Sequence, residues 1–240
     1  MSFEPLAHAP PPAVTATRQA LLATATTVFA ATGYRAATVR DICRRAGANV
    51  AAVNYHFGTK AGLYREVLRY VQARADERHP FPPRPGAAGR APALRLATFV
   101  HALLFRLLDP GPDAAPGSRL MSREMMEPTV ALELVVREYV QPVADELRAI
   151  VTGFLGPRAP EEQVRAHGMS IVSQCLFYHQ CQPVIRRLFP DLRFTPPDLE
   201  RLAAHITGSC VAALRAATRE RRTPPRDGAR PGSSRKERAP

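Results

Sequence analysis

Apolar side chains recur at helical spacing through most of the chain, and no stretch alternates convincingly as a strand would. The first stripe lies in residues 17–32, which are predicted to form a helix that ends at Gly33. Its apolar positions follow one helical face: Leu21, Leu22, Ala25, Val28 and Phe29. A chain built of such stripes is expected to be all-α.

A short second helix is predicted at residues 39–46. Thr38 precedes it as an N-cap, and Asp41 occupies the third helical position of a partial capping box. Gly47 follows the helix and supplies a left-handed turn at low cost.

A third helix is predicted at residues 50–57, with Asn49 as its cap and Gly58 at its end. Thr59 can cap a fourth helix over residues 60–77. Two short helices joined by a tight turn are typical of a helix-turn-helix unit, whose second helix enters the DNA major groove.

The third helix has an inward and an outward face. Val53 and Phe57 lie four residues apart and can close a core with the first two helices. The outward positions carry small, polar and aromatic side chains and no acid: Val50, Ala51, Asn54 and Tyr55. A DNA major groove accepts such a face.

Each outward side chain has a use against DNA. Asn54 can pair with adenine through two hydrogen bonds, or else hold a phosphate. Val50 and Ala51 are small enough to contact a thymine methyl group. Tyr55 can reach a phosphate or pack on a sugar edge.

Phosphate contacts are expected on either side of this helix. Thr38 lies where free backbone N–H groups at a helix start favour an anion. Lys60 begins the fourth helix, and Arg40, Arg44 and Arg45 of the second helix add positive charge.

The distribution of charge agrees with a nucleic-acid partner. The net charge of +12 divides into +5 in residues 1–80, +2 in residues 81–218 and +5 in residues 219–240. A basic terminal module beside a nearly neutral body suits a polyanion-binding head attached to a sensing body.

Other interpretations stay open. The helices could form an ordinary bundle with a solvated basic face, or a nonspecific nucleoid or RNA-binding protein that binds many sequences alike. An enzyme is a further class, but the chain contains no P-loop, nucleophile elbow, G-x-G-x-x-G or H-E-x-x-H motif. We therefore predict no enzymatic activity, no bound metal and no cofactor.

The chain shows no targeting or membrane segment. No apolar run reaches about 18 residues, and the N-terminus lacks the basic and apolar regions of a secretion signal. A cytoplasmic location and no membrane partner are expected. The cysteines are scattered over predicted helices and are expected to be free thiols: Cys43, Cys175, Cys181 and Cys210.

The helix-turn-helix segment resembles the N-terminal module of the TetR family of transcriptional regulators. The matching positions are Thr38, Ile42, Ala46–Gly47, Tyr55, Phe57 and Lys60. The chain departs from the common family pattern at Asn54 and His56, where tyrosine is frequent. The string AGANVAAVNYHFGTK, with residues 122–142 and 170–190, is similar to the CerR/YbiH-like subgroup, and the resemblance covers residues from about 17 to 215.

The resemblance implies a homodimer whose two heads bind a palindromic operator in double-stranded DNA. Most members are repressors released by a small molecule, so an unidentified effector is an expected partner. The predicted DNA-binding residues are Thr38, Arg40, Asn49, Val50, Ala51, Asn54, Tyr55, His56 and Lys60.

Helices at residues 161–182 and 197–218 are the expected dimer elements, unless their apolar residues only close the core of one subunit. These residues are Val164, Ile171, Val172, Leu176, Leu199, Leu202, Ile206 and Val211. An effector pocket is predicted from adaptable and aromatic side chains, with ordinary core as the alternative: His101, Phe105, Met121, Met125, Phe177 and Tyr178.

Cys175, His179 and Cys181 raise the question of metal or redox sensing. Cys175 and His179 lie four residues apart and would share a helix face, which could hold a soft metal ion. No paired C-x-x-C or H-x-x-x-H motif supports this, so buried cysteine and a partly satisfied histidine are the preferred interpretation.

The predicted fold class is all-α, with an N-terminal three-helix helix-turn-helix DNA-binding module followed by a larger helical ligand-binding and dimerisation domain. The first predicted C-terminal helix is marked by a stripe of Leu96, Phe99, Val100, Leu103 and Leu107, and the others lie at residues 120–127, 128–154 with a kink at Pro142, 161–182 and 197–218. The expected organisation is a disordered N-terminus (1–14), a helix-turn-helix domain (15–78), a Pro-rich linker (79–92), an effector-binding and dimerisation domain (93–218) and a basic disordered tail (219–240).

Overall fold

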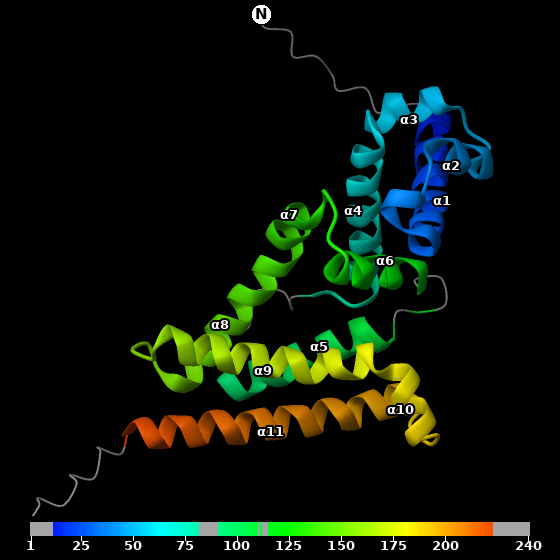
Figure 1. Cartoon of the computed structure of the whole chain (residues 1–240). Helices are drawn as coiled ribbons and strands as arrows, with labels where there is room; N and C mark the ends of the chain where they lie inside the picture. The colour runs from blue at the N-terminus through cyan, green and yellow to red at the C-terminus, as the bar shows by residue number, and fades with distance from the viewer. Residues whose placement is uncertain (1–11, 82–90, 110, 112–114, 223–240) are drawn as a thin grey trace, which may run out of the picture.

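A computed structural model describes residues 12–81, 91–109, 111 and 115–222 of the chain. The regular structure of these residues is helical, which confirms the predicted all-α class (Figure 1). The head consists of α1 (Pro12–Ala36), α2 (Val39–Ala46), α3 (Val50–Phe57) and α4 (Lys60–Arg78). The other elements are α5 (Pro92–Leu108), α6 (Ala115–Met126), α7 (Leu132–Val135), the π-helical η2 (Val136–Val140), α8 (Gln141–Leu155), α9 (Glu161–Gln180), α10 (Gln182–Leu188) and α11 (Pro196–Arg222).

One apolar cluster holds the head together. Phe29 of α1 and Tyr64 of α4 pack edge to face, with ring centroids 4.9 Å apart. Ile42 of α2 and Val53 of α3 are fully buried in the same cluster. Because helices of this length do not persist alone in water, their burial against α1 and α4 is what keeps α2 and α3 folded.

Local capping sets where the helices of the head begin and end. Thr38, Asn49 and Thr59 each accept a hydrogen bond from a backbone N–H in the first turn of the next helix, at 3.1, 2.9 and 3.0 Å. Gly47 has a left-handed backbone with φ 61°. Gly33, with φ 78° and ψ 167°, breaks the helical conformation inside α1. The predicted caps and the turn are therefore confirmed.

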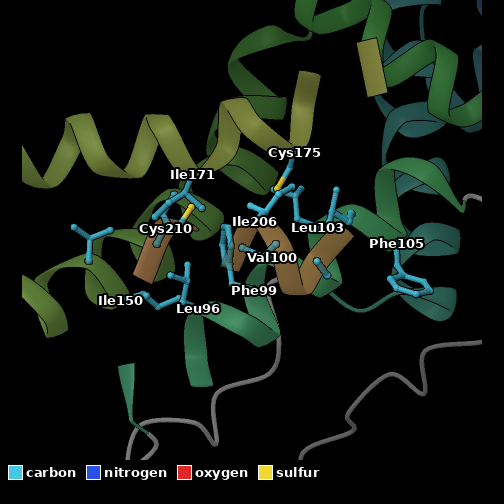
Figure 2. Packing of buried hydrophobic residues seen from close by; sticks show 14 of the residues in the cluster. Leu96, Phe99, Val100, Leu103, Phe105, Ile150, Ile171, Cys175, Ile206 and Cys210 are labelled. Carbon is cyan, nitrogen blue, oxygen red and sulfur yellow. The ribbon is translucent and has the colours of Figure 1, made fainter. Parts of the chain in front are cut away.

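The body is the group formed by α5, α8, α9 and α11, which surround a second cluster. Figure 2 shows Leu96, Phe99 and Val100 of α5 in the same packed region as Ile206 of α11. Four residues that the sequence pattern assigned to a dimer surface are buried in this cluster, so that assignment is wrong for them: Val164, Ile171, Leu199 and Ile206. They close the core of one subunit.

α6 and α7 pack into the head cluster, although they follow the first body helix in the chain. Leu120 of α6 and Leu134 and Val135 of α7 belong to the same cluster as the side chains of α1 and α4. Gly117 permits this approach, since a Cβ there would lie 2.7 Å from a methyl carbon of Val71 on α4. The sequence pattern had grouped α6 and α7 with the C-terminal domain.

Two of the predicted helices end or divide at other residues than the sequence pattern indicated. The helix predicted at 128–154 is divided into α7, η2 and α8, because Pro142 has no N–H and the Gln141 N–H bonds the Val136 carbonyl five residues back. α11 extends to Arg222, beyond the predicted end at residue 218. The remainder of the predicted tail, 223–240, and residues 1–11 lie outside the described residues.

No helix in the described part of the chain is long and apolar enough to cross a membrane. All four cysteines are free, as predicted. Cys43, Cys175 and Cys210 are buried, and Cys181 is half-buried.

Gly62 tests the tight turn between α3 and α4. A Cβ at Gly62 would lie 2.0 Å from the Phe57 carbonyl oxygen, so alanine must displace the backbone. We expect Gly62→Ala to lower the free energy of unfolding by about 1–3 kcal/mol in urea denaturation. Gly168→Ala in α9 is the matched control and should be neutral or stabilising, because its Cβ would meet Leu147 at an ordinary 3.5 Å. Equal losses in both variants would contradict the close approach.

Candidate nucleic-acid interface

The outward face of α3 presents the side chains that sequence reasoning assigned to DNA. Val53 is buried in the head cluster, whereas Ala51 and Asn54 are exposed. Tyr55 has 79% of its surface exposed and Val50 has 39%. Figure 1 shows α3 at the top of the head and α11 at the opposite end of the molecule. The face is therefore presented at one end of the protein.

Polar side chains surround this face. Thr38 and Asn49 are exposed, and each uses a side-chain oxygen as a helix cap. Since the Thr38 hydroxyl only accepts in this cap, its proton can still donate to an anion at the start of α2. His56 is half-buried, with its ring 5.0 Å from the ring of Tyr55.

The arginines of α2 differ in their surroundings. Asp41 pairs with Arg44 at 2.5 Å and with Arg45 at 2.9 Å. Hydrogen bonds from Arg45 and then Arg44 lower the pKa of Asp41 below its ordinary value, so this carboxylate stays ionised and offsets part of their charge. Arg40 is exposed and takes no part in these or other ion pairs of the described residues. Of the α2 arginines, Arg40 has the most freedom to reach a phosphate.

Lys60 is anchored on the end of α1. Its Nζ donates a hydrogen bond to the Arg35 carbonyl oxygen at 3.1 Å and lies 4.8 Å from the centroid of the Tyr34 ring. An ammonium group has three donors, so this contact leaves two for an anion. The sequence pattern predicted a phosphate contact for Lys60, but it could not reveal the contacts of Lys60 with Arg35 and Tyr34 at the end of α1.

Arg18 is a basic residue near α3 that the sequence interpretation missed. Its guanidinium pairs with Glu66 at 2.5 Å and lies 5.5 Å from the centroid of the Phe57 ring at the end of α3. Arg18 belongs to the first turns of α1, far from α3 in sequence. Local spacing therefore carried no signal for its position.

The residues predicted to line an effector pocket divide between the two clusters. His101 and Phe105 stack with ring centroids 4.3 Å apart. Tyr178 packs against the body cluster, whereas Met121 packs against the head cluster. The remaining two are exposed: Met125 and Phe177. The effector pocket at these residues stays a prediction.

A hollow of about 580 Å³ lies where the head meets α6 and the loop that follows it. Tyr34 and Tyr64 line it from the head, and Arg123, Glu127 and Thr129 line it from the other side. None of the residues predicted for the effector pocket lines this hollow.

His179 and Cys175 have separate surroundings. His179 Nδ1 lies 3.0 Å from the Leu107 carbonyl oxygen, and Nε2 lies 2.8 Å from Ser122 Oγ. Burial in the body cluster raises the pKa of the Cys175 thiol to about 12. The described ranges bring together no group of three His, Cys, Asp or Glu residues suited to a metal ion. The geometry thus lends no support to metal or thiol sensing at these residues.

This geometry is that of a helix-turn-helix protein with a second, helical domain. Residues 21–67 match the family model described as bacterial regulatory proteins of the tetR family. Residues 92–216 match the C-terminal domain of the HTH-type transcriptional dual regulator CecR. The chain belongs to the TetR family of DNA-binding transcriptional regulators, and its C-terminal domain is of the CecR type.

Known relatives agree with this assignment. The chain is 28% identical over 172 residues to the dual regulator CecR of Shigella flexneri, covering 67% of this chain and 74% of that protein. A putative transcriptional regulator from Pseudomonas aeruginosa PAO1 aligns with a TM-score of 0.60 at 22% identity, over 85% of this chain and 92% of its own. A transcriptional regulator from Rhodococcus sp. Rha1 aligns with a TM-score of 0.54 at 20% identity, over 82% and 96%. The two solved structures show that the fold is shared.

Proposed function

We propose that this protein is a ligand-responsive repressor that binds a palindromic operator as a homodimer and is released by a small-molecule effector. The outward face of α3 carries the proposal, because it is free of acids and leaves Val50 and Tyr55 exposed on the second helix of a helix-turn-helix. Similarity to a CecR-type regulator supports a place in the CerR/YbiH-like subgroup. A regulator of this kind acts in the cytoplasm, where its operator is.

Base reading is assigned to the exposed positions of α3. We assign exposed Asn54 to pairing with adenine through two hydrogen bonds, and exposed Val50 and Ala51 to contacts with thymine methyl groups. Tyr55 extends from the same face toward the sugar–phosphate backbone.

Phosphate binding is assigned to the residues on either side of α3. Thr38 and Arg40 supply donors from the start of α2, and Lys60 supplies them from the start of α4. Asn49 and His56 border the same face. Each neutralised phosphate releases counterions, so these contacts contribute affinity that falls with salt, while α3 supplies selectivity.

The dimer surface is assigned to the solvent side of α9 and α11. α9 exposes Ala166, Met169, Ser170, Ser173 and Phe177, and α11 exposes Ala204, Gly208, Ser209, Ala212 and Ala213. Small side chains one turn apart let two helices approach closely. A two-fold dimer built on this surface would present two copies of α3 to the two halves of a palindrome.

Release by an effector requires that the ligand bind two arrangements of the protein unequally. We place the effector in the C-terminal domain, near the predicted residues His101, Phe105, Met121, Met125, Phe177 and Tyr178. Ligand binding then shifts α4, the helix that links the head to the rest of the chain. This shift changes the separation of the two heads in the dimer.

Asn54→Ala tests base reading. Selection of duplexes from a random pool with the purified wild-type protein first identifies the operator. Because a lost bidentate base contact costs about 1–3 kcal/mol at each half-site, the variant dimer should bind the operator at least about thirtyfold more weakly while its affinity for random DNA changes little. Titrations of the two duplexes measure both affinities. Equal losses on both would rule out base reading by Asn54, and a wild type without any preferred duplex would overturn the proposed repressor.

Lys60→Gln tests phosphate binding. Glutamine removes the charge but keeps a donor for the Arg35 carbonyl, so the end of α1 stays anchored. We expect weaker binding to all duplexes alike and a salt dependence of log K reduced by about 0.9 per subunit. Arg119→Gln, at an exposed position of α6, should leave the slope unchanged. A slope equal to that of wild type in Lys60→Gln would show that Lys60 holds no phosphate.

Gly208→Arg tests the dimer surface. Gly208 has open space around its missing Cβ, so arginine is compatible with the folded subunit but blocks close approach of a second α11. Sedimentation velocity should show a dimer for the wild type and a monomer for this variant. Ala144→Arg, at an exposed position of α8, should remain dimeric. A Gly208→Arg variant that stays dimeric would place the interface elsewhere.

A further inference from the structure

α6 makes polar contacts to the head and to the body from nearly adjacent residues. Toward the head, the Glu124 side chain is 0% exposed and its Oε2 accepts a hydrogen bond from the Tyr64 hydroxyl at 2.8 Å. Toward the body, Ser122 Oγ lies 2.8 Å from His179 Nε2 of α9. The helix is therefore bonded on both sides within a single turn.

The contact with the head is a complete network. The backbone N–H and the hydroxyl of Thr129 each donate to Glu124 at 3.0 Å, and Tyr64 supplies the other donor. Burial, and then the bond to Glu124, raise the pKa of Tyr64, so its hydroxyl stays a donor. A buried carboxylate loses much free energy when a donor moves away, so this network tolerates little change in the angle between α4 and α6.

The hydrogen bonds between α6 and the body also have a defined donor and acceptor at each end. His179 Nδ1 faces the Leu107 carbonyl oxygen, which can only accept, so Nδ1 carries the proton in the neutral ring. Nε2 is then an acceptor, and the Ser122 hydroxyl donates to it. One imidazole thus joins α5, α6 and α9.

Apolar packing does not fill the junction beside Tyr64. Tyr64 borders the hollow of about 580 Å³ from the head, and Arg123 and Thr129 border it from the other side. α4 and α6 approach closely at Gly117, but the hollow leaves the side of α6 near Thr129 without such packing. The directional hydrogen bonds to Glu124 take the place of that packing on this side of α6.

We infer that Tyr64 and Glu124 are positioning residues for operator binding: their hydrogen bond sets the orientation of the head on α6, and thereby the spacing of the two α3 helices in a dimer. The inference rests on the proposed binding of a palindrome by a dimer. Neither residue lies on the outward face of α3, so neither touches DNA in this arrangement.

Tyr64→Phe in the full-length chain tests the inference, since it removes only the hydroxyl. Wild type and variant are titrated with the selected operator, with operators whose half-sites are one or two base pairs closer or farther apart, and with a random duplex. We expect a weaker preference among spacings and a loss on the native spacing of at most roughly tenfold, because the bond is also present in the DNA-free protein and only part of its free energy enters the operator affinity. Affinity for the random duplex should stay within about twofold.

Tyr34→Phe is the matched control. Tyr34 lines the same hollow, but its hydroxyl makes no hydrogen bond to α6 in the described part of the chain. This variant should keep the spacing profile of the wild type. Glu124→Gln, which keeps the shape but weakens the acceptor, should reproduce the profile of Tyr64→Phe.

The outcomes separate the inference from the proposed function. A wild-type protein that prefers no duplex overturns the proposed function. A wild type with a preferred operator and a Tyr64→Phe variant with an unchanged spacing profile overturns the inference. Equal losses on every duplex, accompanied by a lower unfolding temperature, also overturn it, because the hydroxyl would then serve stability alone.

Discussion

The burial of α3 on one side determines what the protein can present on the other. Val53 and Phe57 lie in the head cluster, and an eight-residue helix has no stability in water without such contacts. Once these two side chains are inside, helical geometry places Ala51, Asn54 and Tyr55 outside. The core of the head thus sets the orientation of the candidate reading face, and the cap at Asn49 only sets where α3 begins.

The same core connects the reading head to the C-terminal half of the chain. Leu120 and Leu134, from α6 and α7, complete the cluster that holds α3 in place. The core of the head therefore depends on residues that come well after its last helix, α4, in the sequence. Movement of the C-terminal half can reach α3 through this shared core as well as through α4, because a packed cluster transmits displacement.

Local physics explains how much the sequence could predict. The caps and the left-handed Gly47 depend on neighbours within a few residues, and they agree with the structure. Contacts of long sequence separation were missed, such as those of Lys60 with Arg35 and of Arg18 with Glu66. The candidate reading residues came from helical periodicity, whereas their anchoring partners required the tertiary fold.

Periodicity also cannot tell which surface an apolar stripe packs against. Ile171 and Ile206 recur at core spacing and were assigned to a dimer surface, yet both are buried within one subunit. The surface left open on α9 and α11 consists largely of small and polar side chains, which carry a weak hydrophobic signal. For Glu124 of α6 the sequence pattern fails in the other direction. Its charged side chain predicts exposure, but the residue is fully buried.

Glu124 bears on how such a regulator can have two states. A junction closed entirely by apolar packing would hold one angle, since close-packed interiors resist small displacements. In this protein the apolar packing of Leu120 is supplemented by directional hydrogen bonds beside a hollow, which gives the junction a defined first state and room for a second. The difference in free energy between the states then depends on donors such as Tyr64, each contributing on the order of 1.5–3 kcal/mol to a charged acceptor. That magnitude is comparable to typical coupling free energies between two binding sites, about 1–3 kcal/mol, so the proposed effector would need to supply no more than this to change the balance between the states.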